Sequence, residues 1–328
     1  MIVTGPDIQE IRDLRERLTE KTIKTPMLRC AAIEDAIDGG TSVLAKLEFL
    51  QRTGTFKARG ALATLHGLDE MQLAAGVTAV SAGNHAIATA FAAQVLGTTA
   101  KVVMISTANP SRIAACRSFG AEVVLAKDVH EAFEVAKQIQ QEEGRFFVHP
   151  FEGPAVALGT GTVGLEICEQ AGGFDTLVVP IGGGGLIGGI ANAVKQLRPD
   201  CEIIGVEPVG ADSMHRSRAM GEPQSIDKVE TIADSLGAPF ALPYSFALTE
   251  ANVDRLVLVD DRQLRRTMGF LFNAMKIAVE PACAASTAAL LGPLREELQG
   301  KRVVLVMCGS NIDWDTFERQ AIFHEPAA

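Results

Sequence analysis

The chain has 328 residues, of which 47% are hydrophobic and 31 are glycine. An apolar fraction of that size can build a large core, which excludes a disordered chain, and the glycines show no collagen-like period of three. Thirty basic against forty acidic side chains give a formal net charge of −10. An acidic protein of this kind is not expected to bind nucleic acid or an anionic membrane as its main partner.

The N-terminal segment and the cysteines indicate the compartment. Residues 1–18 are polar and helical in period, unlike a signal peptide. The six cysteines include no C-x-x-C pair, which predicts a reducing cytoplasm rather than a disulfide framework or a zinc site. Residues 177–194 are apolar enough to suggest a membrane span, but Pro180 and six glycines favour a strand, a loop and a helix.

Short β-rich runs alternate with helical patterns along the chain. The predicted strands are residues 43–47, 77–81, 101–105, 122–125, 176–180, 203–207, 256–259 and 302–307. Helical patterns between them include residues 84–96, 111–119, 130–142, 186–197 and 262–274. Strands without polar alternation are typical of a parallel sheet covered by helices, so we predict an α/β fold. Ligands of such folds bind beyond the carboxyl ends of the strands, which directs attention to four strand-to-helix turns.

The first turn, residues 51–61, reads QRTGTFKARGA and places Lys57 at the start of a helix. The helix dipole and partial burial both disfavour the ammonium form of such a lysine. A neutral amine in this position is what a Schiff-base lysine requires. Taken alone, however, a lysine at a helix start is usually a solvated surface residue.

The second turn, residues 80–86, contains the sequence SAGNHA. Backbone N–H groups at the start of a helix, together with the Ser81 and Asn84 side chains, can bind a carboxylate or another anion. The alternative is an ordinary helix N-cap formed by Asn84.

The third turn carries four consecutive glycines, Gly182 to Gly185, between a strand and a helix. Their N–H groups can converge on one anion, so the loop suits a phosphate. The pattern Gly183-x-Gly185-x-x-Gly188, with Glu207 ending the next strand, also matches a dinucleotide fingerprint. An NAD-dependent oxidoreductase is therefore an alternative from another class.

The fourth turn follows the last predicted strand and contains Cys308, Gly309, Ser310 and Asn311. Its small polar groups could meet the edge of a heterocycle, and a plain turn is the alternative.

Together, the ordered motifs KLE, QRTGTFKARGA, SAGNHA, GGGGL and CGSN resemble the fold-type II pyridoxal-phosphate enzymes. The resemblance is to the group of serine/threonine dehydratases (threonine ammonia-lyases) and serine racemases, and it spans about residues 21–313. It implies two open, mostly parallel twisted sheets with helices on both faces, a tryptophan synthase β-like fold. It also implies a large cofactor-binding domain (1–67 and 153–328), a small mobile domain (68–152) carrying the Asn84 turn, and a homodimer or homotetramer.

The resemblance assigns roles by position. Lys57 would form the Schiff base with pyridoxal 5'-phosphate and abstract the Cα proton. The remaining cofactor contacts would come from Phe56 beside it, Asn84 at the 3-hydroxyl, the phosphate-binding residues Gly182, Gly183, Gly184 and Gly185, Glu280 near the ring, and Cys308 or Ser310 at the pyridine nitrogen. The substrate carboxylate would lie against Ser81, Ala82, Gly83, Asn84 and His85.

The implied reaction is β-elimination of water from a threonine- or serine-like amino acid, giving a 2-oxo acid and ammonia. Ala82 stands where racemases of the group have a serine acid/base, which favours a dehydratase. An amino-acid racemase, a β-replacement synthase and a catalytically silent cofactor-binding protein are alternatives. Ser235, Cys283 and Ile87 depart from the family pocket, so threo-3-hydroxyaspartate and a hydroxyectoine-breakdown product join threonine and serine as candidate substrates.

A cation site is also expected from the resemblance. Several members bind a divalent ion through a glutamate and an aspartate six residues later. Here Glu207 is present, Ser213 takes the second place, and Asp212 lies one residue short. We therefore predict Mg²⁺ or a monovalent cation at Glu207, Ala211 and Ser213, with a plainly hydrogen-bonded Glu207 as the alternative.

Overall fold

The structure, a computed structural model, describes residues 4–325 and contains two open sheets. The larger sheet has the order β1-β2-β10-β7-β8-β9, where only β1 is antiparallel to its neighbour. Its strands are β1 (Met27–Arg29), β2 (Ser42–Leu47), β7 (Thr176–Pro180), β8 (Glu202–Pro208), β9 (Arg255–Val259) and β10 (Arg302–Met307). The smaller sheet is fully parallel, in the order β5-β4-β3-β6. Its strands are β3 (Val77–Val80), β4 (Ala100–Ile105), β5 (Glu122–Ala126) and β6 (Phe146–Phe147).

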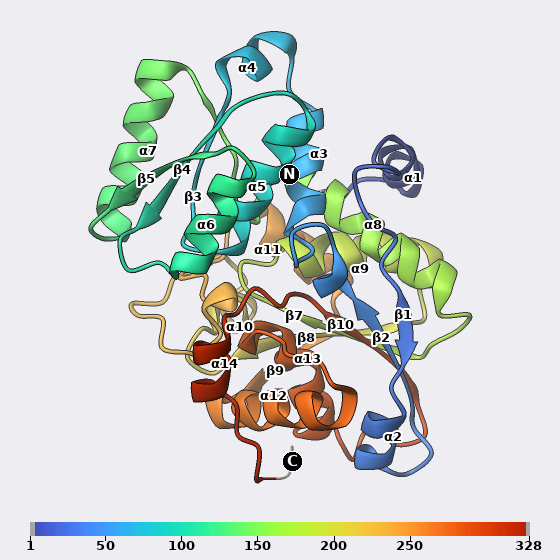
Figure 1. Ribbon diagram of the computed structural model, residues 1–328. Coiled ribbons are helices and arrows are strands. Elements are labelled where there is room, and N and C mark those ends of the chain that lie inside the picture. Colours follow the sequence, from blue (N-terminus) through green and yellow to red (C-terminus); the bar gives the residue numbers. More distant parts are fainter. Residues whose placement is uncertain (1–3, 326–328) are drawn as a thin grey trace.

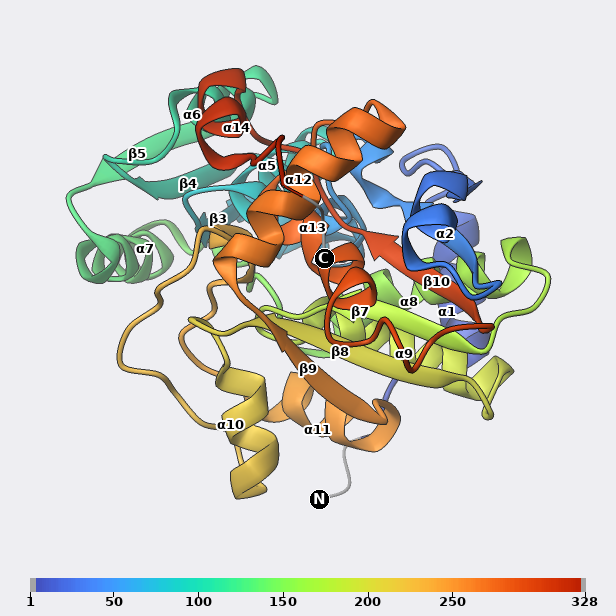
Figure 2. The ribbon, with the colours of Figure 1, turned by 90° about the horizontal axis from the view of Figure 1, so that it is seen from below.

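Helices cover both sheets, as expected for strands that are apolar on both faces. Around the larger sheet, α8 and α9 lie on one face and α12 and α13 on the other (Figure 1, Figure 2). The helices of this part are α1 (Ile8–Arg17), α2 (Ala31–Ile37), α3 (Lys57–His66), α8 (Pro154–Gln170), α9 (Gly185–Leu197), α10 (Ser213–Met220), α11 (Pro243–Asn252), α12 (Asp261–Met275), α13 (Pro281–Leu291) and α14 (Trp314–Gln320). Two 3-10 turns, η1 (Glu48–Leu50) and η2 (Asp234–Leu236), complete it.

The smaller sheet and its helices form a second unit beside the larger sheet (Figure 1). These helices are α4 (Glu70–Ala75), α5 (Asn84–Val95), α6 (Pro110–Ser118) and α7 (Val129–Glu143). All of these elements lie within residues 68–152, the range predicted for the small domain. The core of this unit continues into α3, whose Ala58, Leu62 and Leu65 pack with α5. We call the two parts the large and the small unit.

The predicted α/β fold with two mostly parallel sheets is confirmed. Each predicted strand overlaps one in the structure, and residues 177–194 form β7, the glycine loop and α9. No helix among residues 4–325 is both long and apolar enough to cross a membrane. The sequence shows no helical period over α8 and α13, and neither helix was predicted. Both are buried on almost every side, so neither has the polar stripe that marks an amphipathic helix.

Candidate active site

The four turns singled out in the sequence converge at the carboxyl ends of β3, β7 and β10, where the two units meet. The first and fourth turns are joined directly: the Phe56 N–H donates to the Cys308 carbonyl at 3.2 Å, and the Ser310 N–H donates to the Gly54 carbonyl at 3.0 Å. A narrow cavity at this point is lined by Phe56, Lys57, Asn84, Phe151, Gly182, Gly183, Gly184, Gly185, Ser235, Glu280 and Cys308, among others. Residues predicted from separate motifs therefore share one site.

Lys57 is the first residue of α3, and its side chain is half-buried. Its Nζ donates to the Pro150 carbonyl at 2.5 Å and lies 5.3 Å from the centroid of the Phe56 ring. Burial lowers the pKa of Lys57 to about 8, against a smaller opposing effect of Cys308 and Glu280. A usable fraction of the side chain is thus a neutral amine near neutral pH.

A buried ion-pair network holds the helix that carries Lys57. Arg59, two residues further along α3, contacts Glu48 at 2.8 Å and Glu166 at 2.7 Å, and Lys46 contacts Glu166 at 2.5 Å. All four side chains are almost fully buried. Removing one partner of such a network leaves an uncompensated buried charge and typically costs about 3–5 kcal/mol of stability. The KLE and FKARG motifs therefore share a structural role that the sequence did not reveal.

Asn84 begins α5 and reaches from the small unit to the large one. Its Nδ2 lies 2.8 and 3.0 Å from the two carboxylate oxygens of Glu280 and 3.1 Å from the Ser235 hydroxyl. Its Oδ1 accepts from Asn311 Nδ2 at 2.8 Å. Burial raises the pKa of Glu280 to about 7, partly offset by Arg112, whose guanidinium is 3.6 Å away.

The glycine loop between β7 and α9 forms a backbone cradle. Gly184 has φ +91°, a conformation that other residues rarely adopt, and a Cβ on Gly183 would overlap the Phe151 ring. Within residues 4–325, the N–H groups of Gly182, Gly183 and Gly184 have no hydrogen-bond acceptor. Unpaired N–H groups at the start of a helix suit a phosphate, so the loop fits the phosphate of pyridoxal phosphate.

Cys308 and Ser310 differ in position at the fourth turn. Cys308 is buried and lines the narrow cavity together with Glu280, whereas Ser310 is not among the lining residues. A hydrogen bond with Cys283, together with burial, raises the pKa of the Cys308 thiol well above its usual value. This placement favours a neutral thiol as the group that would face the pyridine nitrogen.

The turn expected to bind the substrate carboxylate borders a wider cleft of about 300 Å³, which Lys57 also lines. Ser81, Ala82, Gly83, Asn84 and His85 all lie along it. The buried His85 donates from Nε2 to the Val148 carbonyl at 2.8 Å. Burial lowers the pKa of His85 to about 3 and that of His149 to about 4, with Lys57 contributing to both. Both imidazoles are therefore neutral near neutral pH.

At the predicted cation site, Glu207 is fully buried and already hydrogen-bonded. Its carboxylate accepts from the N–H groups of Met214 and His215 at 2.9 and 2.8 Å and contacts His215 Nδ1 at 2.8 Å. Asp212 instead contacts Arg216. In the described part of the chain, no three His, Cys, Asp or Glu side chains are arranged to hold a metal ion. A cation at Glu207, Ala211 and Ser213 stays a prediction.

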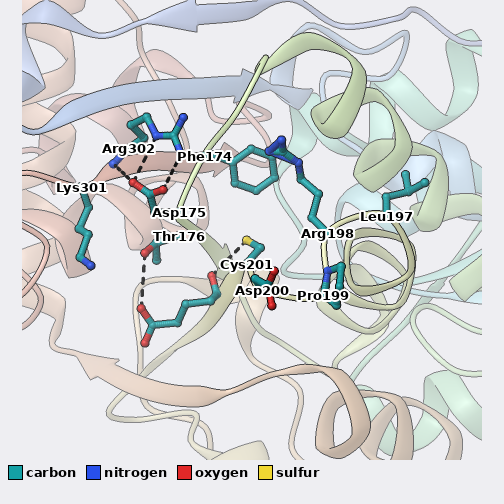
Figure 3. Close-up of a pocket in the computed structure, with 11 residues that line it drawn as sticks. Phe174, Asp175, Thr176, Leu197, Arg198, Pro199, Asp200, Cys201, Lys301 and Arg302 are labelled. Atoms are coloured by element: carbon teal, nitrogen blue, oxygen red, sulfur yellow. Dashed lines mark hydrogen bonds and ion pairs between the residues drawn. The ribbon is translucent and has the colours of Figure 1, made fainter.

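A second cavity, of about 580 Å³, lies where β7, β8 and β10 begin, at the opposite edge of the larger sheet (Figure 3). Two of its acidic groups are paired: Asp175 contacts Arg302 at 2.7 Å, and Glu202 contacts the neighbouring Arg255 at 2.8 Å. Arg198 lies over the Phe174 ring. Because ligands of open α/β sheets bind at the carboxyl ends of the strands, this edge is not the active site.

Several contacts of the site carry no signal in the sequence, although Phe151 itself belongs to the segment His149–Phe151, which resembles a landmark of the family. Arg112 of α6 contacts Asp234 of η2 at 2.5 Å and donates from Nε to the Asn311 carbonyl at 3.1 Å. Phe151 packs against the glycine loop. Each lies far along the chain from its partners, so only folding reveals the contact.

Comparisons with known proteins agree with this geometry. The family described as "Pyridoxal-phosphate dependent enzyme" matches residues 18–309. A phenylserine dehydratase from Ralstonia pickettii is 54% identical over 316 residues, covering 96% of each chain. An L-threonine ammonia-lyase from Thermotoga maritima is 36% identical, over 97% of this chain and 78% of that one. The solved structure of maize serine racemase superposes with a TM-score of 0.91 at 32% identity, covering 96% of both chains.

The family match and the ammonia-lyase relatives exclude the alternative that the chain is an NAD-dependent oxidoreductase. They agree with a half-buried lysine beside a glycine cradle, which an oxidoreductase would not use. The chain therefore belongs to the pyridoxal-phosphate-dependent enzymes, among the dehydratases and ammonia-lyases of hydroxy amino acids.

Proposed function

We propose that the enzyme β-eliminates water from a β-hydroxy amino acid with an apolar β-substituent, similar to phenylserine, to give a 2-oxo acid and ammonia. One observation carries the reaction type: the Lys57 amine, with its lowered pKa, lies at the junction of the glycine cradle and the substrate cleft. A base at that junction can reach the Cα proton of an amino acid held in the cleft.

Each residue of the candidate site would have a separate role in the reaction. When bound, pyridoxal phosphate supplies an electron sink for the bond that breaks at Cα. Lys57 would hold the cofactor and then carry the Cα proton on Nζ, while the Gly182–Gly185 backbone would bind the phosphate. The turn from Ser81 to His85 would orient the substrate carboxylate, and the neutral Cys308 thiol would face the pyridine nitrogen without protonating it. Ala82 has no proton to donate to the opposite face, which supports elimination over racemisation.

The cleft supports an apolar substrate over a dicarboxylic one. Among the described residues that line it, Arg112 is the only Lys or Arg besides Lys57, and it is paired with Asp234 and lies close to Glu280. A second substrate carboxylate, as in threo-3-hydroxyaspartate, would find no free cation there, and leaving a charge unpaired is costly. The phenylserine dehydratase relative points in the same direction.

The test begins with the purified holoenzyme. Borohydride should bleach the visible cofactor band and leave the label on Lys57, as located by peptide mass spectrometry. The enzyme is then given phenylserine, threonine, serine and threo-3-hydroxyaspartate, and the 2-oxo acid is measured. Phenylserine should be the best substrate, and Lys57→Ala should retain less than about a tenth of the activity.

Three results would contradict the proposal. Absence of 2-oxo acid from every substrate would exclude a dehydratase. D-serine formed from L-serine faster than pyruvate would indicate a racemase, and product formed only with a thiol acceptor would indicate a β-replacement synthase.

The proposal includes a cytoplasmic homodimer or homotetramer. All six cysteines are free, which suits a reducing compartment. The oligomeric state rests on the resemblance to the family, and light scattering of the purified protein measures it.

A chelator that changes neither the activity nor the melting temperature would remove the divalent ion from the proposal.

A further inference from the structure

The small unit presents two apolar side chains to the substrate cleft. Val129 and Phe133 lie four residues apart on α7, so they share one face of the helix. They are 57% and 47% exposed, and both line the 300 Å³ cleft. The buried face of α7, with Ala132, Ala136 and Ile139, packs against the small sheet instead. Val129 and Phe133 are therefore not part of the core of their own unit.

Two further aromatic side chains line the cleft. Phe151 and Phe240 both line the cleft, with ring centroids 6.1 Å apart and planes tilted by 49°. Phe151 also meets the His149 ring edge-on at 4.7 Å, which fixes its orientation. His149 is neutral near neutral pH because burial lowers its pKa to about 4, so this wall carries no charge.

The same cleft is also lined by polar groups. Lys57 and the turn from Ser81 to His85 lie where the amino and carboxylate groups of a substrate are expected. A substituent on Cβ then has the apolar walls available to it. A flat, apolar ring suits walls made of three phenylalanines and a valine better than a methyl group does, because it buries more apolar area.

We propose that Val129, Phe133, Phe151 and Phe240 form an aryl subsite for the β-substituent, and that Phe133 determines specificity. The inference rests on the proposed β-elimination and adds which residues select the substrate. Since the subsite is built from both units, an aryl substrate contacts both, and its binding covers the exposed faces of Val129 and Phe133.

The experiment compares Phe133→Ala and Phe133→Leu with Leu125→Ala in the holoenzyme. Leu125 is a matched control, because it is 50% exposed on β5 of the same unit and does not line the cleft. Phe133→Ala should lower kcat/KM for phenylserine about tenfold or more and change that for threonine less than about twofold. Phe133→Leu should recover part of the loss, and Leu125→Ala should behave as the unchanged enzyme.

Binding gives a readout that does not depend on turnover. L-Phenylalanine lacks the β-hydroxyl leaving group, so its affinity relative to L-alanine, measured by calorimetry, reports on the subsite alone. Phe133→Ala should weaken L-phenylalanine binding about tenfold and leave L-alanine unchanged. Equal changes for both ligands, or no change, would overturn the aryl subsite even if the dehydratase activity is confirmed. Conversely, a selective loss of L-phenylalanine binding would support the subsite even if no hydroxy amino acid were dehydrated.

Discussion

At the scale of single residues, the active centre depends on two groups whose burial shifts their protonation in useful directions. Burial lowers the pKa of Lys57 to about 8 and raises that of Glu280 to about 7. Both shifts have the same cause: a charge is costly away from water. The outcome is a lysine that can act as a nucleophile and base, and a glutamate that is partly uncharged beside Asn84.

The lowered pKa of Lys57 predicts how cofactor loading depends on pH. Only the neutral amine attacks the cofactor aldehyde, and its fraction rises from about one tenth at pH 7 to about nine tenths at pH 9. The rate at which cofactor-free protein gains its visible absorbance should therefore rise about tenfold over this range and level off above pH 8–9. A rate that still climbs steeply between pH 9 and 10 would indicate an ordinary, solvated lysine.

Glu280 predicts a pH dependence of stability in the cofactor-free protein. Its pKa in the folded state is above its value in the unfolded chain, so the folded state holds the proton more tightly. The stabilisation is complete below about pH 4.5 and is lost as the pH rises through about 7. His85 and His149, whose pKa values burial lowers, titrate in the same range with the opposite sign, so the Glu280 contribution is the difference between the unchanged protein and Glu280→Gln, which stays uncharged. From pH 5 to pH 8 the unchanged protein should lose about 2.5 kcal/mol of stability relative to Glu280→Gln, measured by urea unfolding. Parallel pH profiles of the two proteins would contradict the assignment.

At the scale of elements, the strand-loop-helix unit β7–Gly182–Gly185–α9 sets where the phosphate can bind. Its backbone is accessible because glycine has no Cβ, and Phe151 packs against the space that a side chain would occupy. The loop therefore requires glycine for its close packing against Phe151 as much as for the flexibility of its backbone.

Gly183→Ala tests this element. The added methyl group would overlap the Phe151 ring, so either the ring or the loop must move. We expect the affinity for pyridoxal phosphate to fall about tenfold or more, as measured by fluorescence titration of the cofactor-free protein. Gly67→Ala is the control, because its Cβ would make only ordinary contacts, the nearest at 3.5 Å. Equal affinities in the two variants would exclude a tight fit at the loop.

At the scale of the whole molecule, the candidate site lies where the parts built on the two sheets meet. The units share α3, which packs on α5 on one side and on α8 on the other. Across the cleft they are joined by polar contacts, among them Asn84 with Glu280 and Arg112 with Asp234. We propose that the small unit closes over a substrate and excludes water from the enamine product.

Arg112→Ala tests how the units are held together. Asp234 is 56% exposed and can be solvated when its partner is lost, but the buried Glu280 also loses its nearest cation, so the free energy of unfolding should fall by about 1–3 kcal/mol. Hydrogen exchange at residues 81–85 and 234–240 should become faster than elsewhere in the large unit, because the contact between the units opens locally. Arg216→Ala, which removes an exposed contact with Asp212 within the large unit, should leave that exchange unchanged. Faster exchange in both variants would show a general effect of lost charge.

The sequence by itself determined the fold class and the cofactor, and it singled out the four turns that meet at the candidate site. Strand and helix periods, glycines and short motifs are local properties, and a parallel sheet brings the carboxyl ends of its strands to one edge. Tertiary structure alone decided that Arg59, Glu48, Lys46 and Glu166 form one buried network, and that Phe133, Phe151 and Phe240 line one cleft. These contacts join residues up to about 120 positions apart in the chain. A local sequence pattern does not determine how far apart two units lie in space.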